Sequence, residues 1–571
     1  MKQRSPTDLV SNRRGSTHET KARGLAVLNS PLLNKGTAFA AEERKALGLT
    51  GLLPPDISTL AVQVKRAYLQ YEMLPDSLNK NIYLTALHDR NEVLFYRLFS
   101  EHLREMIPIV NDVTVGMAMK QYRHECRPPR GVYLSIDHPG SIEEAFSNFG
   151  AADDIDLILA TDAEQIPGVG DWGVGGIEVS IGKLAIYTAA GGVDPSRVIP
   201  VMLDVGTNRQ SLLEDPTYIG NRHSRVRGPR YDAFIDAYVE VVTKLFPKAF
   251  LQWEDFAPVN GRRIVEKYRE RFCTLNEDIQ GTGAIGLAAA ISAARVCATP
   301  LRNQRIVVFG AGTAGMGVAD QIRNAMVREG LSPEDAARCF WCVDKQGLLT
   351  SGIPDLHAFQ TPYARPPAES KGWRHDAGVD VVGLAEVVRR VKPTMLIGAS
   401  TVSGSFTEEI VRDMAAHTER PIIFALSNPQ GRSEANPGDL IAWTEGRALI
   451  ATGSPFAPVT FKGVTYVIAQ LNNAMLYPGL GLGAIVSRAR RISNDMLAAA
   501  ARAVSSLVAV RLPGASLLPQ IDDLRSVSVS VAVAVAEAAQ AEGIARVRFH
   551  DIVQQVQDAM WRPEYRRLLA S

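Results

Sequence analysis

The chain has 571 residues, 46% of them hydrophobic and 7% aromatic, a composition that is ordinary for globular proteins and excludes disorder of the whole chain. This length exceeds the size at which a single core stops growing, so we expect two or more domains. The 62 basic and 61 acidic side chains nearly cancel, which removes the electrostatic footprint of proteins that bind nucleic acids or membrane surfaces. The expected partner is therefore a small molecule.

The five cysteines are scattered and odd in number, which favours free thiols in a reducing compartment. No apolar run reaches the ~18 to 20 uncharged residues of a membrane span, and the nearest, residues 284–298, contains Arg295. Residues 1–23 are polar and lack the apolar core of a signal peptide, so we expect a flexible tail. Together these features favour the cytoplasm.

Residues 24–130 are predicted to form a helical N-terminal region. Apolar side chains recur three and four positions apart over residues 42–47, 60–69 and 82–103. That spacing puts them on one face of a helix, and prolines between the segments mark the breaks. We therefore expect this region to be all-α.

Residues 131–279 are predicted to form an α/β domain. Strand-like apolar runs alternate with helical ones, which is typical of βαβ units around a parallel sheet. The expected strands are residues 131–136, 155–161, 198–205 and 249–253, and the expected helices are residues 182–190 and 231–246.

Residues 280–471 contain a second alternating series, which predicts a Rossmann-type domain. The strand-like runs are RIVVF, FWCVD, MLIGAS, PIIFALS and ALIATGS, with a helix expected over residues 315–328. From residue 472 onward the pattern is helical, and we assign residues 472–571 to the first α/β domain. Valines alternate with small residues over 527–535, which alone predicts a strand, but the flanking alanines and glutamates favour a helix.

A candidate dinucleotide site lies at Gly310, Gly312, Ala314 and Gly315. These residues follow the apolar run RIVVF and open a predicted helix. In that context the glycines let the backbone approach a pyrophosphate at the helix N-terminus. Asp344 ends the next strand, where its carboxylate would accept from the adenosine ribose hydroxyls and repel a 2′-phosphate. The pattern favours NAD, with NADP not excluded.

Two acidic pairs are candidate metal ligands. Glu254 and Asp255 follow the apolar run AFLQW, and Glu277 and Asp278 lie in NEDIQGTG. Carboxylate oxygens are the hard ligands that Mg²⁺ and Mn²⁺ prefer, and three of them would suffice. An acidic pair is more often a solvated face, but both pairs adjoin apolar strands or glycine turns, which weakens that interpretation.

Lys183 and two asparagines complete the candidate site. Lys183 lies in SIGKLAIYTAAGG. A lysine near a metal has its ammonium form disfavoured and could act as a general base, although a lone lysine at a helix start is more often a surface residue. Asn428 and Asn473 could simply form turns, but near a dinucleotide their amides could donate to a substrate carboxylate or the nicotinamide.

Twelve sequence runs, in one order from about Leu32 to Gly479, together resemble the malic enzymes. They include GDWGVGG, IGKLAIYTA, QWEDFA, EDIQGTG, FALSNP and NNAMLYPG. The resemblance implies an α/β fold with a helical N-terminal region, a substrate and metal domain at residues 131–279 with 472–571, and a Rossmann-type NAD-binding domain at residues 280–471. It also implies a homodimer or homotetramer.

The resemblance also assigns roles to residues. The implied reaction is the oxidative decarboxylation of (S)-malate to pyruvate and CO₂ with reduction of NAD(P)⁺, dependent on Mg²⁺ or Mn²⁺. Lys183 matches the base that accepts the proton of the C2 hydroxyl as hydride leaves. The residues that match the other roles are Glu254, Asp255 and Asp278 for the metal, and Asn428 and Asn473 for the substrate, with Asn428 also near the cofactor.

Two positions depart from the family pattern. The family's catalytic tyrosine, which helps protonate the enol carbon, lies in a YTPTVG-like run, whereas this chain has Asn111 followed by DVTVG. An amide cannot act as a general acid at neutral pH, and general acid catalysis contributes ~10² to 10⁴ in rate. Gln165 stands where several members carry a substrate-binding arginine.

These departures leave two alternatives open. The chain could act on another 2-hydroxy acid, or decarboxylate without net redox. It could also be a paralogue that has lost turnover and acts as a binding or regulatory subunit. The intact Lys183 and the three metal carboxylates argue against complete decay of the site.

Overall fold

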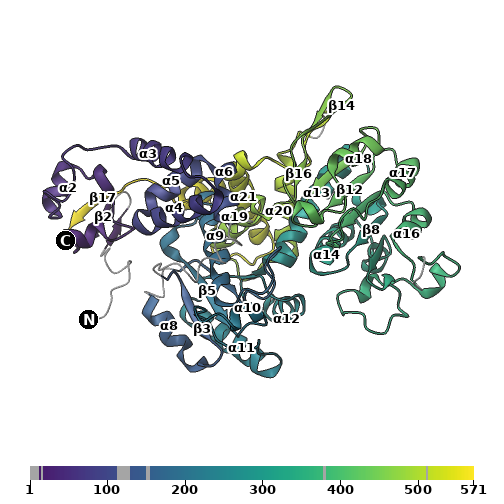
Figure 1. Ribbon diagram of the computed structural model, residues 1–571, viewed down its shortest axis with the longest axis horizontal. Coiled ribbons are helices and arrows are strands. Elements are labelled where there is room, and N and C mark those ends of the chain that lie inside the picture. The colour runs from purple at the N-terminus through teal and green to yellow at the C-terminus, as the bar shows by residue number, and fades with distance from the viewer. Residues whose placement is uncertain (1–11, 15–16, 112–128, 150–154, 377–380, 510–511) are drawn as a thin grey trace. The chain divides into compact units, whose positions relative to one another are not determined.

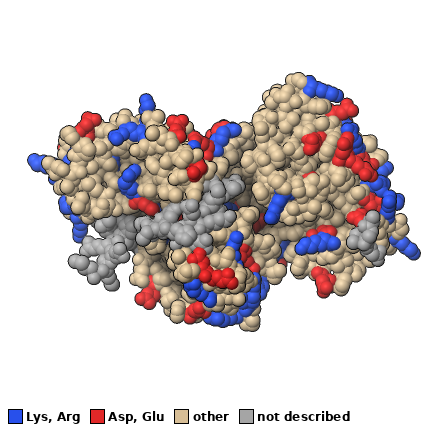
Figure 2. Space-filling model, in the orientation of Figure 1, with Lys and Arg blue, Asp and Glu red and all other residues tan. Residues whose placement is uncertain are grey.

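The computed structural model describes residues 12–14, 17–111, 129–149, 155–376, 381–509 and 512–571 (Figure 1). The chain divides into two compact units. Unit 1 comprises residues 1–256 with 554–571, and unit 2 comprises residues 257–553. On the face shown in Figure 2, basic and acidic side chains are interspersed on the surface, in keeping with the near-zero net charge.

Short helices form the N-terminal part of unit 1, as predicted. The single helical run expected over residues 82–103 is divided, however, at Asn91. Its backbone is extended and its side chain accepts a hydrogen bond from the Leu94 N–H, so it ends one helix and caps the next. The helices are α1 (Leu25–Leu28), α2 (Ala41–Ala46), α3 (Leu60–Glu72), α4 (Ser77–Arg90), α5 (Glu92–Glu101) and α6 (Leu103–Val110).

The prediction of a flexible tail over residues 1–23 is wrong for the residues of this segment that the structure describes. Strand β2 (Thr17–Thr20) pairs with β1 (Asn12–Arg14) and, in parallel, with β17 (Arg567–Ala570) near the C-terminus (Figure 1). The Leu568 side chain of β17 is buried in an apolar cluster with Val27 and Phe39. No local pattern predicts the pairing of β2 with β17, because these two strands lie more than 540 residues apart in the sequence.

A parallel sheet forms the centre of unit 1, as predicted. Every side chain of its strands β4 and β6 is buried, which explains why these segments are apolar without alternation. Within unit 1 the strands lie side by side in the order β3 (Val132–Ser135), β5 (Val198–Asp204), β4 (Leu157–Thr161) and β6 (Phe250–Glu254). The main helices around them are α8 (Ile142–Phe149), α9 (Ile177–Ala189) and α11 (Pro229–Leu245).

Unit 2 contains the predicted Rossmann-type sheet. Six of its described strands run parallel in the order β9 (Phe340–Asp344), β8 (Ile306–Phe309), β11 (Met395–Gly398), β12 (Ile422–Ala425), β13 (Leu449–Thr452) and β16 (Ala469–Gln470). The chain leaves β8 on one side for β9 and returns on the other for β11. This reversal creates a topological switch point, where open α/β sheets bind ligands.

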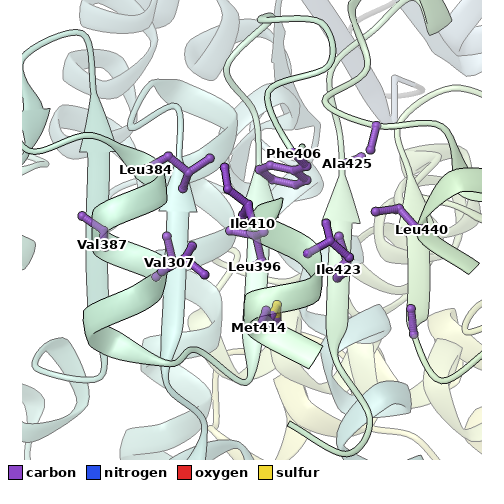
Figure 3. Close-up of a cluster of buried hydrophobic side chains, with 14 of the residues drawn as sticks. Val307, Leu384, Val387, Leu396, Phe406, Ile410, Met414, Ile423, Ala425 and Leu440 are labelled. Atoms are coloured by element: carbon purple, nitrogen blue, oxygen red, sulfur yellow. The ribbon is translucent and has the colours of Figure 1, made fainter. Parts of the chain in front are cut away.

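Apolar side chains from the sheet and from helices on one face form the core of this domain (Figure 3). Val307, Leu396 and Ile423 come from three neighbouring strands. Leu384 and Ile410 pack against them from two helices. The helices of the domain are α14 (Thr313–Arg328), α15 (Pro333–Ala337), α16 (Leu384–Val391), α17 (Glu408–His417) and α18 (Pro437–Trp443).

The C-terminal helices differ from the prediction in the unit to which they belong. Residues 472–553 cluster with unit 2 and not with the substrate domain, and the boundary falls at residue 256, not 279. The cause is packing between helices, since α20 contacts α13, and α21 contacts both α19 and α20. These helices are α13 (Thr282–Val296), α19 (Tyr477–Ser487), α20 (Asn494–Ser506) and α21 (Leu524–Ala541).

The helix preferred over residues 527–535 is confirmed as part of α21. Val527, Val531 and Val535 are buried one turn apart. Gly479 and Gly483 of α19 allow the close approach, because a Cβ at either would lie only 2.5 to 2.7 Å from a carbonyl oxygen of α21.

Residues 277–296 and 521–541 are long and apolar enough to cross a membrane by length and composition alone. The first segment is 78% buried and the second 44% buried inside the structure. Both pack on other helices of unit 2, and buried core helices meet the same criterion.

Replacing Leu568 by alanine is expected to loosen the N-terminal part of unit 1. The change would leave a cavity in the apolar cluster and lower the free energy of unfolding by about 2 to 5 kcal/mol. Leu569→Ala, at an exposed neighbour, should change it by less than about 0.5 kcal/mol. Urea denaturation and hydrogen exchange over residues 24–49 would measure both variants, and equal effects would contradict the buried role of β17.

Candidate functional site

Carboxylates gather at the carboxyl ends of three neighbouring strands of unit 1. Asp162 directly follows β4, Asp204 ends β5 and Glu254 ends β6. All three are buried. Because parallel α/β sheets bind ligands at this edge, these residues mark the candidate site of unit 1.

Lys183 lies inside α9 and is buried, with only 5% of its surface exposed. Its Nζ forms an ion pair with the Glu254 carboxylate. A buried ammonium is tolerated only when it is paired, so the surface-lysine interpretation is wrong for this residue. The structure therefore joins the predicted base to one of the predicted metal ligands.

Two residues that the sequence analysis missed extend this pair. Tyr187 donates a hydrogen bond to the Gln252 side-chain oxygen, and Gln252 Nε2 donates to Glu254 Oε2 at 3.2 Å. Tyr187 lies one helical turn after Lys183, and Gln252 lies two residues before Glu254 on the same side of β6. These spacings, i to i+4 in a helix and i to i+2 in a strand, are the signal that could have found them.

Asn111 ends α6 beside the turn of α9 that carries Lys183. A Cβ at Gly182 would lie 2.4 Å from the Val110 carbonyl oxygen and 3.1 Å from Asn111 Oδ1, so only glycine fits there. Asn111 Oδ1 is buried and has no hydrogen-bond partner among the residues that the structure describes. The structure thus places the Asn111 position next to the residue preceding Lys183.

Gln165 and Asp255 are connected through the backbone. The Gln165 N–H donates to the Asp255 carbonyl oxygen at 2.9 Å, while the Gln165 side chain is exposed. Asp255 is buried and adopts a left-handed conformation with φ of 60°. A non-glycine residue held in this conformation is a common feature of functional sites.

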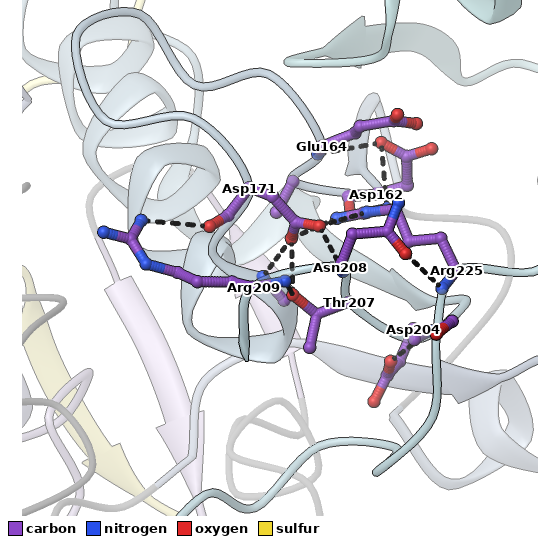
Figure 4. A network of polar contacts seen from close by, with 12 residues as sticks. Asp162, Glu164, Asp171, Asp204, Thr207, Asn208, Arg209 and Arg225 are labelled. Atoms are coloured by element: carbon purple, nitrogen blue, oxygen red, sulfur yellow. Dashed lines mark hydrogen bonds and ion pairs between the residues drawn. The ribbon is translucent and has the colours of Figure 1, made fainter. Parts of the chain in front are cut away.

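A buried arginine joins the loops at this edge of the sheet (Figure 4). Arg225 donates to both carboxylate oxygens of Asp171 at 2.8 Å and to the Asp162 carbonyl oxygen at 2.8 Å. Thr207 Oγ1 and the Asn208 N–H also donate to Asp171, each at 2.8 Å. This network fixes the loop after β4 to the loop after β5. The sequence analysis did not find it, because its members show no periodic spacing.

Burial raises the pKa of Asp162 to about 6, and the Arg225 charge offsets this effect only in part. The carboxylate accepts a hydrogen bond from the Tyr231 hydroxyl at 2.8 Å. Asp162 therefore titrates closer to neutrality than an exposed aspartate does.

The glycine turn of unit 2 has the geometry that the motif predicts. Gly310 has φ of 94°, and a Cβ there would lie 2.4 Å from the Ala399 carbonyl group. A Cβ at Gly315 would lie 2.2 Å from the Gly310 carbonyl oxygen, whereas Gly312 faces open space among the described residues. Ala314 lies in the first turn of α14. An open glycine at a helix N-terminus fits a pyrophosphate.

Asp344 ends β9 as predicted and is linked to the glycine turn by Gln360. Gln360 Nε2 donates to Asp344 Oδ2 at 3.2 Å and to the Ala311 carbonyl oxygen at 2.9 Å. Gln360 is buried and lies outside every predicted motif. It holds the candidate ribose-binding carboxylate next to the turn.

The two predicted asparagines lie in unit 2 in different settings. Asn428 is exposed after β12, and Ser454 Oγ donates to its Oδ1 at 2.6 Å, which leaves its N–H groups to donate to a ligand. Asn473 Nδ2 donates to Glu277 Oε2 at 2.7 Å. Carboxylate oxygens of Glu277 and Asp278 lie within 4.8 Å of one another. Glu277 is fully buried, and this donor set fits a hard divalent cation.

Two sequence models of known families match the chain. Residues 88–269 match the malic enzyme N-terminal domain, and residues 279–540 match the malic enzyme NAD binding domain. The NAD-dependent malic enzyme 3 of Bacillus subtilis is 58% identical over 553 residues, which cover 97% of this chain and 98% of the relative. The chain belongs to the malic enzyme family. The resemblance and the α/β fold class with an NAD-binding domain are thereby confirmed.

Other malic enzyme relatives differ in their named activity. The malolactic enzyme of Leuconostoc mesenteroides is 45% identical over 543 residues, covering 95% of this chain and 98% of that protein. The crystal structure of the Entamoeba histolytica malic enzyme aligns with a TM-score of 0.54 at 21% identity, covering 92% and 91% of the two chains. This structural likeness shows the shared fold.

Replacing Arg225 by methionine is expected to lower the free energy of unfolding by about 3 to 5 kcal/mol, because two carboxylates lose their buried counter-charge. Arg227→Met is the matched control, since the Arg227 side chain is 48% exposed and pairs with Glu164 at the surface. Its effect should stay below about 1 kcal/mol. Chemical denaturation of both variants is the measurement, and a small effect of Arg225→Met would refute the network's structural role.

Asp162 should make the protein less stable as pH rises. Its folded-state pKa of about 6 lies above the ~3.9 of an unfolded aspartate. Between these values the folded state holds a proton that the unfolded chain has released, so stability present at low pH is lost as pH rises through about 6. Asp162→Asn should remove this part of the dependence, about 2 kcal/mol between pH 4 and 7. Denaturant titrations at several pH values would test it, and parallel curves would contradict it.

Proposed function

We propose that the chain catalyses the metal-dependent oxidative decarboxylation of (S)-malate to pyruvate and CO₂ with reduction of NAD⁺. The observation that carries this proposal is the buried pair of Lys183 and Glu254 at the carboxyl edge of a parallel sheet, in a member of the malic enzyme family. The B. subtilis relative, named an NAD-dependent malic enzyme, supports the choice of substrate and cofactor.

The proposed ligands of Mg²⁺ or Mn²⁺ are Glu254, Asp255 and Asp278. Glu254 and Asp255 are almost fully buried, and buried carboxylates are stable only when paired with cations or hydrogen-bond donors. When bound, the metal would polarise the C2 oxygen of malate while NAD⁺ accepts the hydride. The chain would supply hard oxygen donors from side chains that are buried away from solvent.

Lys183 is the proposed base, accepting the proton of the C2 hydroxyl. If Glu254 held a cation, the Lys183 ammonium would lose a partner, and this would favour the neutral amine that can accept a proton. Tyr187 and Gln252 keep Glu254 oriented during this exchange.

The proposed NAD site comprises Gly310, Gly312, Ala314, Gly315 and Asp344. The open turn at the start of α14 would receive the pyrophosphate, and Asp344 would accept from the ribose. The negative charge of Asp344 disfavours the 2′-phosphate of NADP. We further propose a homodimer or homotetramer, as the family resemblance implies, and a cytoplasmic location.

The proposed substrate contacts come from amides. Asn428 presents N–H donors, because Ser454 occupies its oxygen, and these would bind a carboxylate of malate or the nicotinamide amide. Asn473 and Gln165 are the other proposed contacts. Gln165 carries no charge, so it would bind a carboxylate less strongly than an arginine would.

The departure at Asn111 permits a second candidate function, which a relative supports. With an amide at the position of the family's tyrosine, the chain could yield lactate and CO₂ from malate without net reduction of NAD⁺, the alternative opened by the sequence. A relative that is 45% identical is named a malolactic enzyme, which supports this alternative. A binding or regulatory subunit without turnover is the remaining alternative.

Wild-type protein given L-malate, NAD⁺ and Mn²⁺ is expected to form NADH and pyruvate in equal amounts. Lys183→Ala should reduce kcat by about 10² or more, because the general base is removed. Lys244→Ala, at an exposed surface ion pair, is the control and should leave kcat unchanged. Lactate without accumulating NADH would establish the second candidate, and NADH binding without turnover of any 2-hydroxy acid would establish the binding subunit.

Asn111→Tyr is expected to raise kcat at least about tenfold, since a phenol can supply part of the ~10² to 10⁴ of general acid catalysis. Asn111→Phe is the matched control, because it adds the same ring without the hydroxyl and should give no increase. Steady-state assays of pyruvate release compare the two. Equal rates for wild type and Asn111→Tyr would show that another group already acts as the acid.

A further inference from the structure

Glu434 is a fully buried carboxylate of unit 2 that the proposed reaction does not use. Among the described residues, four hydrogen bonds hold this carboxylate, and two serines donate them. Ser400 donates to Oε1 through its N–H and its hydroxyl, both at 2.8 Å. Ser427 donates to Oε1 through its hydroxyl at 2.5 Å and to Oε2 through its N–H at 3.3 Å. The carboxylate therefore bridges two separate loops.

These loops lie at the switch point of the Rossmann-type sheet. Ser400 follows β11, and Ser427 follows β12 immediately before Asn428. A Cβ at Gly310 would lie 2.4 Å from Ala399 and 2.6 Å from the Ser400 Cα, so the glycine turn packs directly on the first loop. Glu434 thus holds the backbone against which the dinucleotide turn rests.

Other contacts around Glu434 also fix the conformation of the loop after β11. The Thr401 N–H donates to Ser427 Oγ at 2.8 Å, and Thr401 itself is held at φ of 61°. A Cβ at Gly398 would lie 2.6 Å from the Glu434 Cγ, so the end of β11 leaves room for the glutamate. A strained residue and an obligatory glycine beside one carboxylate indicate that the loop geometry is tightly determined.

We propose that Glu434 is a positioning residue for the dinucleotide, setting the loop that supports Gly310 and the loop that carries Asn428. The inference rests on the proposed function only for the identity of the cofactor. Charge-assisted hydrogen bonds are stronger than neutral ones, so the carboxylate fixes both loops where a neutral side chain would not. Its removal therefore acts on cofactor affinity and not on stability alone.

The test is a fluorescence titration of NADH, without metal or malate, on Glu434→Gln in the full-length protein. The amide keeps the shape and the oxygen that accepts three of the four bonds, but it loses the charge and turns its NH₂ group toward the Ser427 N–H, which itself donates. We expect the Kd for NADH to rise at least about tenfold, because displacements of about 1 Å in a site have effects of up to ~10².

Glu386→Gln is the matched control. Glu386 is also a buried carboxylate of unit 2, and it accepts from Arg389 and Arg390 at 2.8 Å and from the Arg374 N–H at 3.2 Å. None of these partners belongs to the glycine turn or the two loops. This variant should lower the thermal midpoint as Glu434→Gln does, while its Kd for NADH stays at the wild-type value.

An unchanged Kd for Glu434→Gln with a lowered thermal midpoint would overturn the proposal and leave a purely structural role. If this variant does not fold, Ser427→Ala and Ser400→Ala each remove one hydroxyl donor, and an unchanged Kd in both would equally overturn it. Wild-type protein that binds no NADH would overturn the cofactor assignment together with this inference. Binding of NADH without turnover of malate would overturn only the proposed reaction.

Discussion

Negative charge buried at the carboxyl ends of parallel strands is the constraint on which both units depend. An isolated carboxylate in a protein interior is costly, and the buried carboxylates of Glu254, Asp162 and Glu434 are held by donors from neighbouring helices, strands and loops. In unit 1, Lys183 pairs with Glu254, and Arg225 joins Asp162 to Asp171. The loops cannot move far without leaving a charge unpaired, and this makes the edge of the sheet rigid before any ligand arrives.

The same constraint explains why the strands supply apolar surface while the polar groups lie at the strand ends and in the loops. Strands β4 and β6 are buried on both faces and contribute mainly apolar surface, so the polar groups appear only where the strands end. In unit 2 the glycine turn also places polar groups at a strand end. These groups carry partial positive charge, because they are backbone N–H groups at a helix N-terminus. Unit 1 thus presents carboxylates suited to a cation, and the turn presents donors suited to an anion.

The sequence predicted what repeats locally and missed what depends on distant partners. Strand and helix periodicity located the parallel strands of both units, and the motifs located Lys183, Glu254 and Gly310. The strand β17 escaped prediction because its partner lies near the other end of the chain. Arg225 and Glu434 escaped for a related reason: a buried charge is recognised by what surrounds it, and neither residue stands in an apolar pattern of its own. Asn91 was missed because a cap interrupts a helical pattern without changing its period.

At Asn111 the backbone keeps its place against α9, while the side chain lacks the acidic group that the family's reaction uses there. Because Gly182 has no side chain, the end of α6 can lie directly against α9. This backbone contact places residue 111 against α9 and does not depend on the side chain of residue 111. The Asn111 Oδ1 is buried there without a hydrogen-bond partner among the described residues. The base and the acid of the proposed reaction act at different atoms, C2 oxygen and C3 carbon, so losing the phenol leaves removal of the hydroxyl proton by Lys183 intact. In the proposed reaction the substitution would therefore act on the fate of the decarboxylated product and not on the oxidation of malate at C2.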